Sequence, residues 1–157
     1  MIFNSLSIAQ MQQLAQIVAG SLTSGDVVTL SGEVGSGKTT FARALIQHLS
    51  AGAPEITSPT FNLMQSYDVT LGNGAKETLW HLDLYRLKNK AEAEELGLSE
   101  LLPHITVIEW PELIQNMLPA NHLNIAFDFG RNQETRTLVI SGNEAWQNKL
   151  KNKKTTV

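Results

Sequence analysis

A glycine-rich stretch between an apolar β-branched run and an amphipathic segment constrains this chain more than any other feature. Residues 32–39 read Gly-Glu-Val-Gly-Ser-Gly-Lys-Thr, which matches the pattern G-x-x-x-x-G-K-[ST] at every required position. The run at residues 27–30 favours a buried strand before it, and apolar positions recur at helical spacing over residues 38–49. This order of strand, loop and helix predicts a loop that binds the phosphates of a nucleotide.

The chemistry of triphosphate binding explains the residue types in this loop. Glycines let successive backbone amides turn toward anionic oxygens, and a helix starting at Lys38 adds its positive N-terminal end. We expect Lys38 to reach the β- and γ-phosphates, Thr39 to bind Mg²⁺ and Thr40 to lie near the α-phosphate. The motif predicts these nucleotide-binding residues: Gly32, Glu33, Val34, Gly35, Ser36, Gly37, Lys38, Thr39 and Thr40.

A second group of polar residues lies on the strand predicted at residues 77–84. The strand period of two places His81, Asp83 and Tyr85 on one face, opposite an apolar face. A nucleotide site with this loop needs an acidic residue at the end of a neighbouring buried strand, which holds magnesium or orients the attacking water. Asp83 is therefore a candidate, although a structural salt bridge to Arg86 or a turn-capping role is an alternative use of this carboxylate.

Glu109 is the other candidate carboxylate, because it ends the apolar run at residues 105–108 and lies two residues before Pro111. We favour Glu109 as the metal-side carboxylate and Asp83 as the group that orients water, with Lys38 completing the predicted catalytic set. The reverse assignment of the two carboxylates stays open. An acidic strand end that simply meets solvent is the alternative for Glu109.

Residues 57–61, Thr-Ser-Pro-Thr-Phe, form a candidate switch loop after the predicted helix. Loops in this position can be ordered by the γ-phosphate and Mg²⁺ and released on hydrolysis. We expect Thr60 or Ser58 to make that contact. An ordinary Ser/Pro turn leading into a strand is the alternative.

The rest of the sequence predicts a single α/β domain over residues 1–157, in which helices flank a P-loop NTPase-like mixed β-sheet. Helices are expected from Ser7 to about Gly20, over 91–102 with a break at Gly97, from Pro111 to Pro119, and from about Asn143. Strands are expected as a hairpin of 61–69 with 77–84, a buried strand at 105–108, and a pair at 123–129 and 135–140. The tail, about residues 150–157, is expected to fray.

Composition limits the partners and the compartment. The formal net charge is -3, so the basic surface of a protein that grips nucleic acid by itself is missing, and we expect no DNA partner. The absence of cysteine suits a reducing cytoplasm, and no apolar run is long enough for a membrane span. These features predict a cytoplasmic protein without a membrane role.

Four blocks in this order resemble the TsaE (YjeE) family: residues 32–40, 57–61, 81–86 (His-Leu-Asp-Leu-Tyr-Arg) and 108–110 (Ile-Glu-Trp). The similarity covers roughly residues 5 to 140. The resemblance implies a small bacterial ATPase required for the threonylcarbamoyl modification of adenosine 37 in tRNA. It implies ATP and Mg²⁺ as cofactors, TsaD and TsaB as partners, and tRNA reached indirectly through that complex.

The resemblance also implies roles for individual residues. Mg²⁺ would be bound through Thr39 and Glu109, with functional roles for Asp83 and Trp110, while Arg131 in the turn after Gly130 would help to close the nucleotide pocket. Residues expected to respond to nucleotide or partner are Ser58, Thr60, His81, Tyr85, Arg86 and Trp110.

Two other functions fit the motif. A small-molecule kinase would transfer the γ-phosphoryl group to an acceptor, but such enzymes usually close an arginine-rich lid, and here the arginines are dispersed. A nucleotide-dependent binding switch would dock on a partner with little turnover of its own.

Overall fold

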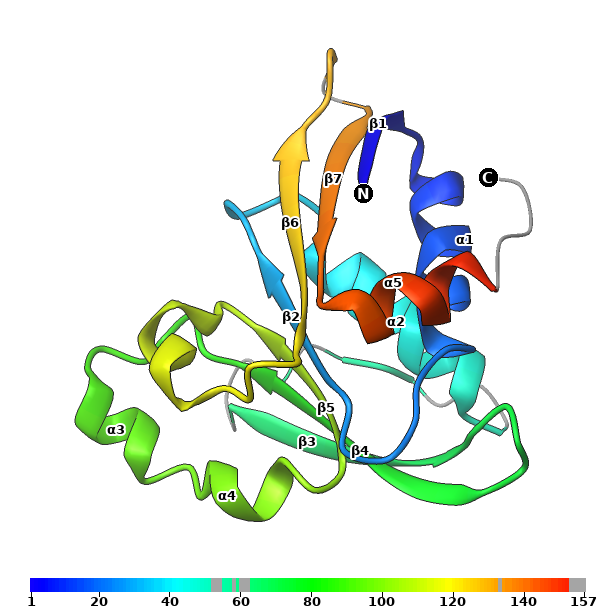
Figure 1. Ribbon diagram of the computed structural model, residues 1–157. Coiled ribbons are helices and arrows are strands. Elements are labelled where there is room, and N and C mark those ends of the chain that lie inside the picture. The colour runs from blue at the N-terminus through cyan, green and yellow to red at the C-terminus, as the bar shows by residue number, and fades with distance from the viewer. Residues whose placement is uncertain (52–54, 58, 60–62, 133, 153–157) are drawn as a thin grey trace.

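The computed structural model describes residues 1–51, 55–57, 59, 63–132 and 134–152. Within these ranges, seven strands form one mixed sheet in the order β1-β7-β6-β2-β5-β4-β3, flanked by helices (Figure 1). The strands are β1 (Ile2–Leu6), β2 (Val27–Ser31), β3 (Met64–Thr70), β4 (Lys76–Asp83), β5 (Ile105–Glu109), β6 (Leu123–Phe129) and β7 (Arg136–Ser141). The helices are α1 (Ile8–Ala19), α2 (Lys38–Leu49), α3 (Lys90–Glu94), α4 (Leu98–Leu101), the 3-10 helix η1 (Pro111–Met117) and α5 (Glu144–Lys151).

The centre of the sheet is parallel. Strand β2 pairs with β5 on one side and β6 on the other, and β4 pairs with β5, all in parallel. The register places Leu30 beside Glu109 and Asp83 beside Glu109. Because parallel strands end at the same edge of a sheet, β2, β5 and β4 bring their carboxyl ends together, where ligands bind in open α/β sheets.

Alternating side chains divide the interior into two apolar layers. On β5, Val107 joins the core beneath α1 and α2, whereas Ile108 joins the core beneath α3, α4 and η1. On β4, Leu79 and Leu82 divide in the same way. Figure 1 shows the two groups of helices on opposite sides of the sheet. Both faces of the central strands are therefore buried, which explains their continuous apolar runs.

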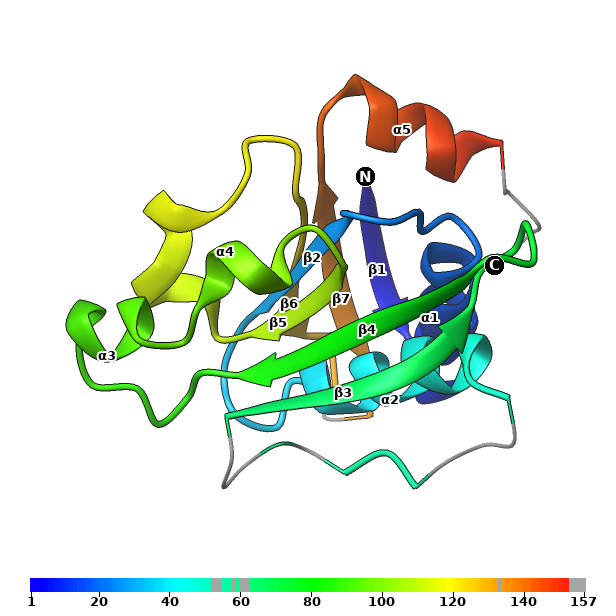
Figure 2. The same ribbon diagram turned by 90° about the horizontal axis from the view of Figure 1, so that it is seen from below.

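Most of the predicted elements are confirmed. Ser7 and Gln10 form a reciprocal capping box at the start of α1. Strands β3 and β4 form the predicted antiparallel hairpin, which runs along one edge of the sheet (Figure 2). Gly97 divides the expected helix 91–102 into α3 and α4, because its φ of 67° is left-handed. The helix that begins at Pro111 is confirmed in position but has 3-10 geometry.

Two expectations about the ends of the chain need correction. Strand β1 was not predicted, and it forms by antiparallel pairing with β7. The expected fraying from about residue 150 is wrong for Leu150 and Lys151, which belong to α5. Leu150 is only 5% exposed, and Lys149 Nζ lies 2.6 Å from Asp26 Oδ2, so both side chains fix the helix. Residues 153–157 lie outside the described ranges.

The lengths and polarity of the helices can be compared with what a membrane span requires. Across the ranges that the structure describes, each helix is too short or too polar to cross a lipid bilayer.

A polar cluster at the end of the sheet where β2, β4 and β5 begin predicts that the stability of the fold depends on acid pH. The Ser24 hydroxyl, His104 Nδ1 at 2.9 Å and the Thr78 amide at 2.8 Å all contact the Glu77 carboxylate. These contacts, the Ser24 hydrogen bond first, lower the pKa of Glu77 to about 2. A depressed carboxyl pKa stabilises the fold above the unfolded value of about 4.3, and this stabilisation is lost as the pH falls toward the folded value.

We therefore expect Glu77→Gln to reduce the free energy of unfolding near neutral pH by an amount that shrinks below about pH 4. Urea unfolding of the wild type and Glu77→Gln between pH 2 and pH 7 measures this, with about 0.5 pH steps. Glu100→Gln, at an exposed position of α4, is the matched control. A difference that stays constant across the whole range would contradict the assignment.

Candidate nucleotide-binding site

The loop between β2 and α2 has a backbone that few side chains allow. Gly32 has a φ of 136°, and a Cβ atom there would lie 2.4 Å from the carbonyl oxygen of Phe127. Gly37 has a φ of 106° immediately before the first residue of α2. Glycine is therefore required at both ends of the loop, for the close approach to β6 and for the turn into the helix.

Lys38 is buried inside this loop, with 4% of its surface exposed. Its Nζ donates hydrogen bonds to the carbonyl oxygens of Gly32 and Glu33, each at 2.7 Å. Burial lowers the pKa of Lys38, and the negative charges of Glu109, Glu112 and Asp83 oppose that shift. The carboxylates thus offset only part of the effect of burial on the ammonium group.

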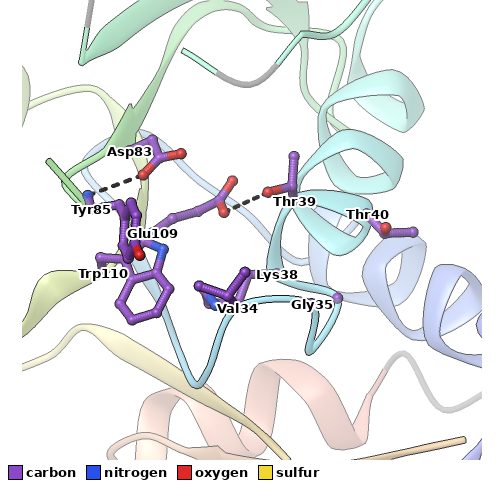
Figure 3. A pocket seen from close by; sticks show the side chains of 10 residues that line it. Val34, Gly35, Lys38, Thr39, Thr40, Asp83, Tyr85, Glu109 and Trp110 are labelled. Carbon is purple, nitrogen blue, oxygen red and sulfur yellow. Dashed lines mark hydrogen bonds between the residues drawn. The ribbon is translucent and has the colours of Figure 1, made fainter. Parts of the chain in front are cut away.

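A buried hydrogen-bonded chain connects α2 to the neighbouring strands. The Thr39 hydroxyl donates to Glu109 Oε2 at 2.8 Å, and His81 Nε2 lies 2.9 Å from Glu109 Oε1. His81 is fully buried and Glu109 is 1% exposed. Both carboxylate oxygens of Glu109 therefore have partners, which fix the carboxylate at the end of β5. Figure 3 shows the contact with Thr39.

Asp83 lies beside Glu109 at the end of β4, as the strand register requires. Its Oδ1 accepts a hydrogen bond from the Tyr85 amide at 3.1 Å. Both carboxylates face a cavity of about 290 Å³ between the loop and the strand ends (Figure 3). The cavity is lined by Val34, Gly35, Gly37, Lys38, Thr39, Thr40, Asp83, Tyr85, Glu109 and Trp110.

Two aromatic rings form one wall of this cavity. The rings of Tyr85 and Trp110 lie 4.8 Å apart, and the Lys38 ammonium lies 4.0 Å from the centre of the Trp110 ring. Trp110 has a φ of 59°, the left-handed conformation at the junction of β5 and η1. Tyr85 is 58% exposed. The cation–π contact of Trp110 adds to the interactions that hold Lys38.

The structure does not bring every predicted site residue to the cavity. Ser58 and Thr60 lie outside the described residues. Arg86 and Arg131 are exposed, and neither lines the cavity among the described residues, so their predicted roles stay predictions. Gly32 and Glu33 line an adjoining cavity with Val34, Tyr85 and Trp110.

Sequence reasoning missed Arg136, a residue of β7. Its Nε donates to the carbonyl of Ser36 at 3.0 Å, and its Nη2 donates to the carbonyl of Gly35 at 3.1 Å. Arg136 therefore contacts the loop from a strand that is about a hundred residues away in the chain. No motif marks such a contact, because only the folded sheet brings β7 beside the loop.

The oxygen atoms near Thr39 suit a hard divalent cation. The hydroxyl of Thr39 and the carboxylate of Glu109 are adjacent, and the Asp83 carboxylate lies on the next strand. Mg²⁺ in nucleotide sites uses one or two protein oxygens together with water and phosphate oxygens. The donor set in the described structure therefore fits Mg²⁺.

Comparisons with known proteins agree with this architecture. The family model described as "Threonylcarbamoyl adenosine biosynthesis protein TsaE" matches residues 5–138. A protein of Rickettsia felis named tRNA threonylcarbamoyladenosine biosynthesis protein TsaE is 35% identical over 136 residues, which cover 85% of this chain and 77% of the relative. The Bacillus subtilis protein of the same name is 33% identical over 133 residues, covering 83% and 79% of the two chains.

A solved structure shows the same fold. The crystal structure of YdiB from Bacillus subtilis superposes with a TM-score of 0.73, at 24% sequence identity, and covers 98% of this chain and 93% of that chain. The predicted α/β fold with its P-loop NTPase-like mixed sheet is thereby confirmed. From the family model and the relatives together, this chain belongs to the TsaE family of threonylcarbamoyl adenosine biosynthesis proteins.

Proposed function

We propose that this chain binds ATP with Mg²⁺ and hydrolyses the γ-phosphate, in support of the threonylcarbamoyl modification of adenosine 37 in tRNA. The observation that carries the proposal is the 2.8 Å hydrogen bond between Thr39 and Glu109, with Asp83 on the neighbouring strand. A phosphate loop, a magnesium-binding hydroxyl and two strand-end carboxylates are the parts that phosphoryl transfer to water requires. ATP is proposed as the nucleotide because of the family resemblance.

Each residue has a distinct task in the proposed reaction. Loop amides and Lys38 bind the phosphate oxygens, and Thr39 and Glu109 hold the cation. A bound Mg²⁺ would neutralise part of the negative charge of the phosphates. Asp83, fixed through its contact with the Tyr85 amide, orients a water molecule in line with the bond to ADP. Water adds to the γ-phosphorus while the bond to ADP breaks, and the proton that the water loses passes to the Asp83 carboxylate and then to solvent. The products are ADP and inorganic phosphate.

We further propose TsaD and TsaB as the partners, with tRNA contacted through them in the cytoplasm. The net charge of -3 supports this assignment, because a protein without a basic surface binds tRNA poorly by itself and the partner would bind the tRNA. The rim of the site is exposed and apolar at Val34, which is 66% exposed, and at Tyr85. These side chains provide a surface on which a partner can complete the site.

The test is steady-state ATP hydrolysis by the purified chain, alone and with TsaD, TsaB and tRNA. We expect the partners to raise kcat by about tenfold or more, which corresponds to about 1.4 kcal/mol in the barrier. Lys38→Met in the same mixture is the control for contaminating activity. An unchanged rate would contradict the partner assignment.

The same mixtures distinguish the two other functions. A kinase would move the γ-phosphoryl group from ATP to an acceptor, so radiolabel would appear in a phosphorylated metabolite instead of inorganic phosphate. A binding switch would show nucleotide-dependent affinity for the partners without stimulated hydrolysis.

A further inference from the structure

Arg136 joins the β7 strand to the outer side of the phosphate loop. We propose that Arg136 is a positioning residue that keeps the second half of this loop in its phosphate-binding shape. The inference rests on the proposed function, because it concerns how the same loop binds nucleotide. It adds a residue that lies outside the glycine-rich motif and outside the two strands that carry the carboxylates.

Among the described residues, the guanidinium group donates to the backbone carbonyls of Ser36, Gly35 and Thr135. Nε contacts Ser36 at 3.0 Å, Nη2 contacts Gly35 at 3.1 Å, and Nη1 contacts Thr135 at 2.8 Å. A planar guanidinium presents its N–H groups in a fixed fork, so two consecutive carbonyls held together are constrained in direction as well as in distance. A lysine ammonium has no such fork.

The direction of these carbonyls determines the direction of the amides that follow them. In a trans peptide unit the C=O and the next N–H point to opposite sides, and the described residues contain no cis peptide bond. Holding the carbonyls of Gly35 and Ser36 toward Arg136 therefore turns the N–H groups of Ser36 and Gly37 away from it. The Ser36 amide accordingly faces inward, where it contacts the Glu33 carbonyl at 3.2 Å.

Two cations share the stabilisation of the loop. Lys38 donates to the carbonyls of Gly32 and Glu33, in the first half of the loop, and Arg136 donates to those of the second half. In the proposed function, phosphate oxygens draw the ammonium of Lys38 away from its carbonyls. Arg136 is not among the described residues that line the cavity, so its contacts persist and become the main side-chain contacts that hold the loop when nucleotide is bound.

Arg136 is itself held firmly. It begins β7, where it pairs with Phe129 of β6 and Leu6 of β1. Its guanidinium also lies 5.0 Å from the centre of the Phe129 ring. By contrast, the tip of the phosphate loop is exposed at Glu33, Val34 and Gly35 and has little packing of its own. The loop thus gains its order from a neighbouring strand that the sheet already fixes.

Calorimetric titration of ADP and ATP, each with Mg²⁺, into the full chain tests this role. We expect Arg136→Ala to weaken the binding of both nucleotides by about tenfold. Arg136→Lys should weaken it by about threefold, because the lysine ammonium can replace only part of the hydrogen bonds of the guanidinium fork. At saturating ATP, kcat should change by less than about twofold, since the groups around the γ-phosphate remain. Lys151→Ala, which removes one positive charge from the end of α5, should leave affinity unchanged.

Thermal melting without added nucleotide separates binding from folding. A lower melting temperature with wild-type affinity for both variants would overturn the inference and assign Arg136 to the fold alone. If Arg136→Ala lowers the affinity for nucleotide no more than Lys151→Ala does, the inference is overturned as well. If Arg136→Ala does not fold, the titration of Arg136→Lys decides. Wild-type protein that binds neither nucleotide would instead overturn the proposed function, and the inference with it.

Discussion

Lys38→Met is expected to weaken ATP binding by about a hundredfold or more, because it removes charge-assisted hydrogen bonds worth about 1.5–3 kcal/mol each. The Lys38 ammonium lies inside the phosphate loop and is only 4% exposed. Methionine keeps most of the aliphatic stem, so it fills the same space beneath Trp110 without the charge. Calorimetric titration of ATP and ADP with Mg²⁺ measures the loss directly.

The fold should survive this substitution. Burial lowers the pKa of Lys38, because the ammonium group loses hydration inside the loop. Lys38→Met removes the hydrogen bonds to the carbonyls of Gly32 and Glu33, which destabilises the fold. It also removes a buried charge, which stabilises the fold, so the two effects on the free energy of unfolding oppose each other. Lys90→Met, at an exposed position at the start of α3, is the matched control. Affinity of Lys38→Met within about threefold of wild type would contradict the assignment.

Asp83→Asn is expected to reduce kcat by about a hundred- to ten-thousandfold while nucleotide affinity stays within about threefold of wild type. Asparagine retains an oxygen that can accept from the Tyr85 amide, so the turn after β4 is preserved. It loses the negative charge that orients the water molecule and favours its deprotonation. Single-turnover hydrolysis combined with direct titration separates the two effects.

Glu109→Gln provides the comparison on the adjacent strand. Because Glu109 contacts Thr39, its loss should raise the concentration of Mg²⁺ needed for nucleotide binding, an effect that Asp83→Asn should not share. The reverse pattern, in which Asp83→Asn changes the Mg²⁺ requirement and Glu109→Gln only the rate, would exchange the two roles. Loss of binding in Asp83→Asn would show that its role has been assigned wrongly.

Local patterns made most of the fold and the centre of the site predictable. The glycine motif determines its own loop and helix, and the period of two on β4 places His81 and Asp83 on the face that meets Glu109. Turn residues located the β3–β4 hairpin, and Gly97 located the break between α3 and α4. In these segments, the short-range preferences and the final structure agree.

Long-range pairing explains what could not be predicted. The segment Ile2–Leu6 becomes a strand only because β7 offers it an edge, and its register is interrupted between Phe3 and Leu6. Arg136 reaches the phosphate loop only through the order of strands in the sheet. Leu150 lies in polar sequence but belongs to the core, because α5 carries it against the other buried residues. Neither the pairing of β1 with β7 nor the contact of Arg136 with the loop leaves a periodic signal in the sequence.

The hydrogen bonds of Lys38 and Thr39 have a thermodynamic consequence for ligand exchange. Both donors already have good acceptors within the protein: Lys38 contacts the Gly32 and Glu33 carbonyls, and Thr39 contacts Glu109. In the proposed function, a nucleotide with its cation replaces these internal partners, so the net affinity is the difference between two sets of favourable contacts. The same partners are ready to recapture Lys38 and Thr39 as the products leave. If the proposed function holds, this arrangement favours rapid release of bound nucleotide over tight retention.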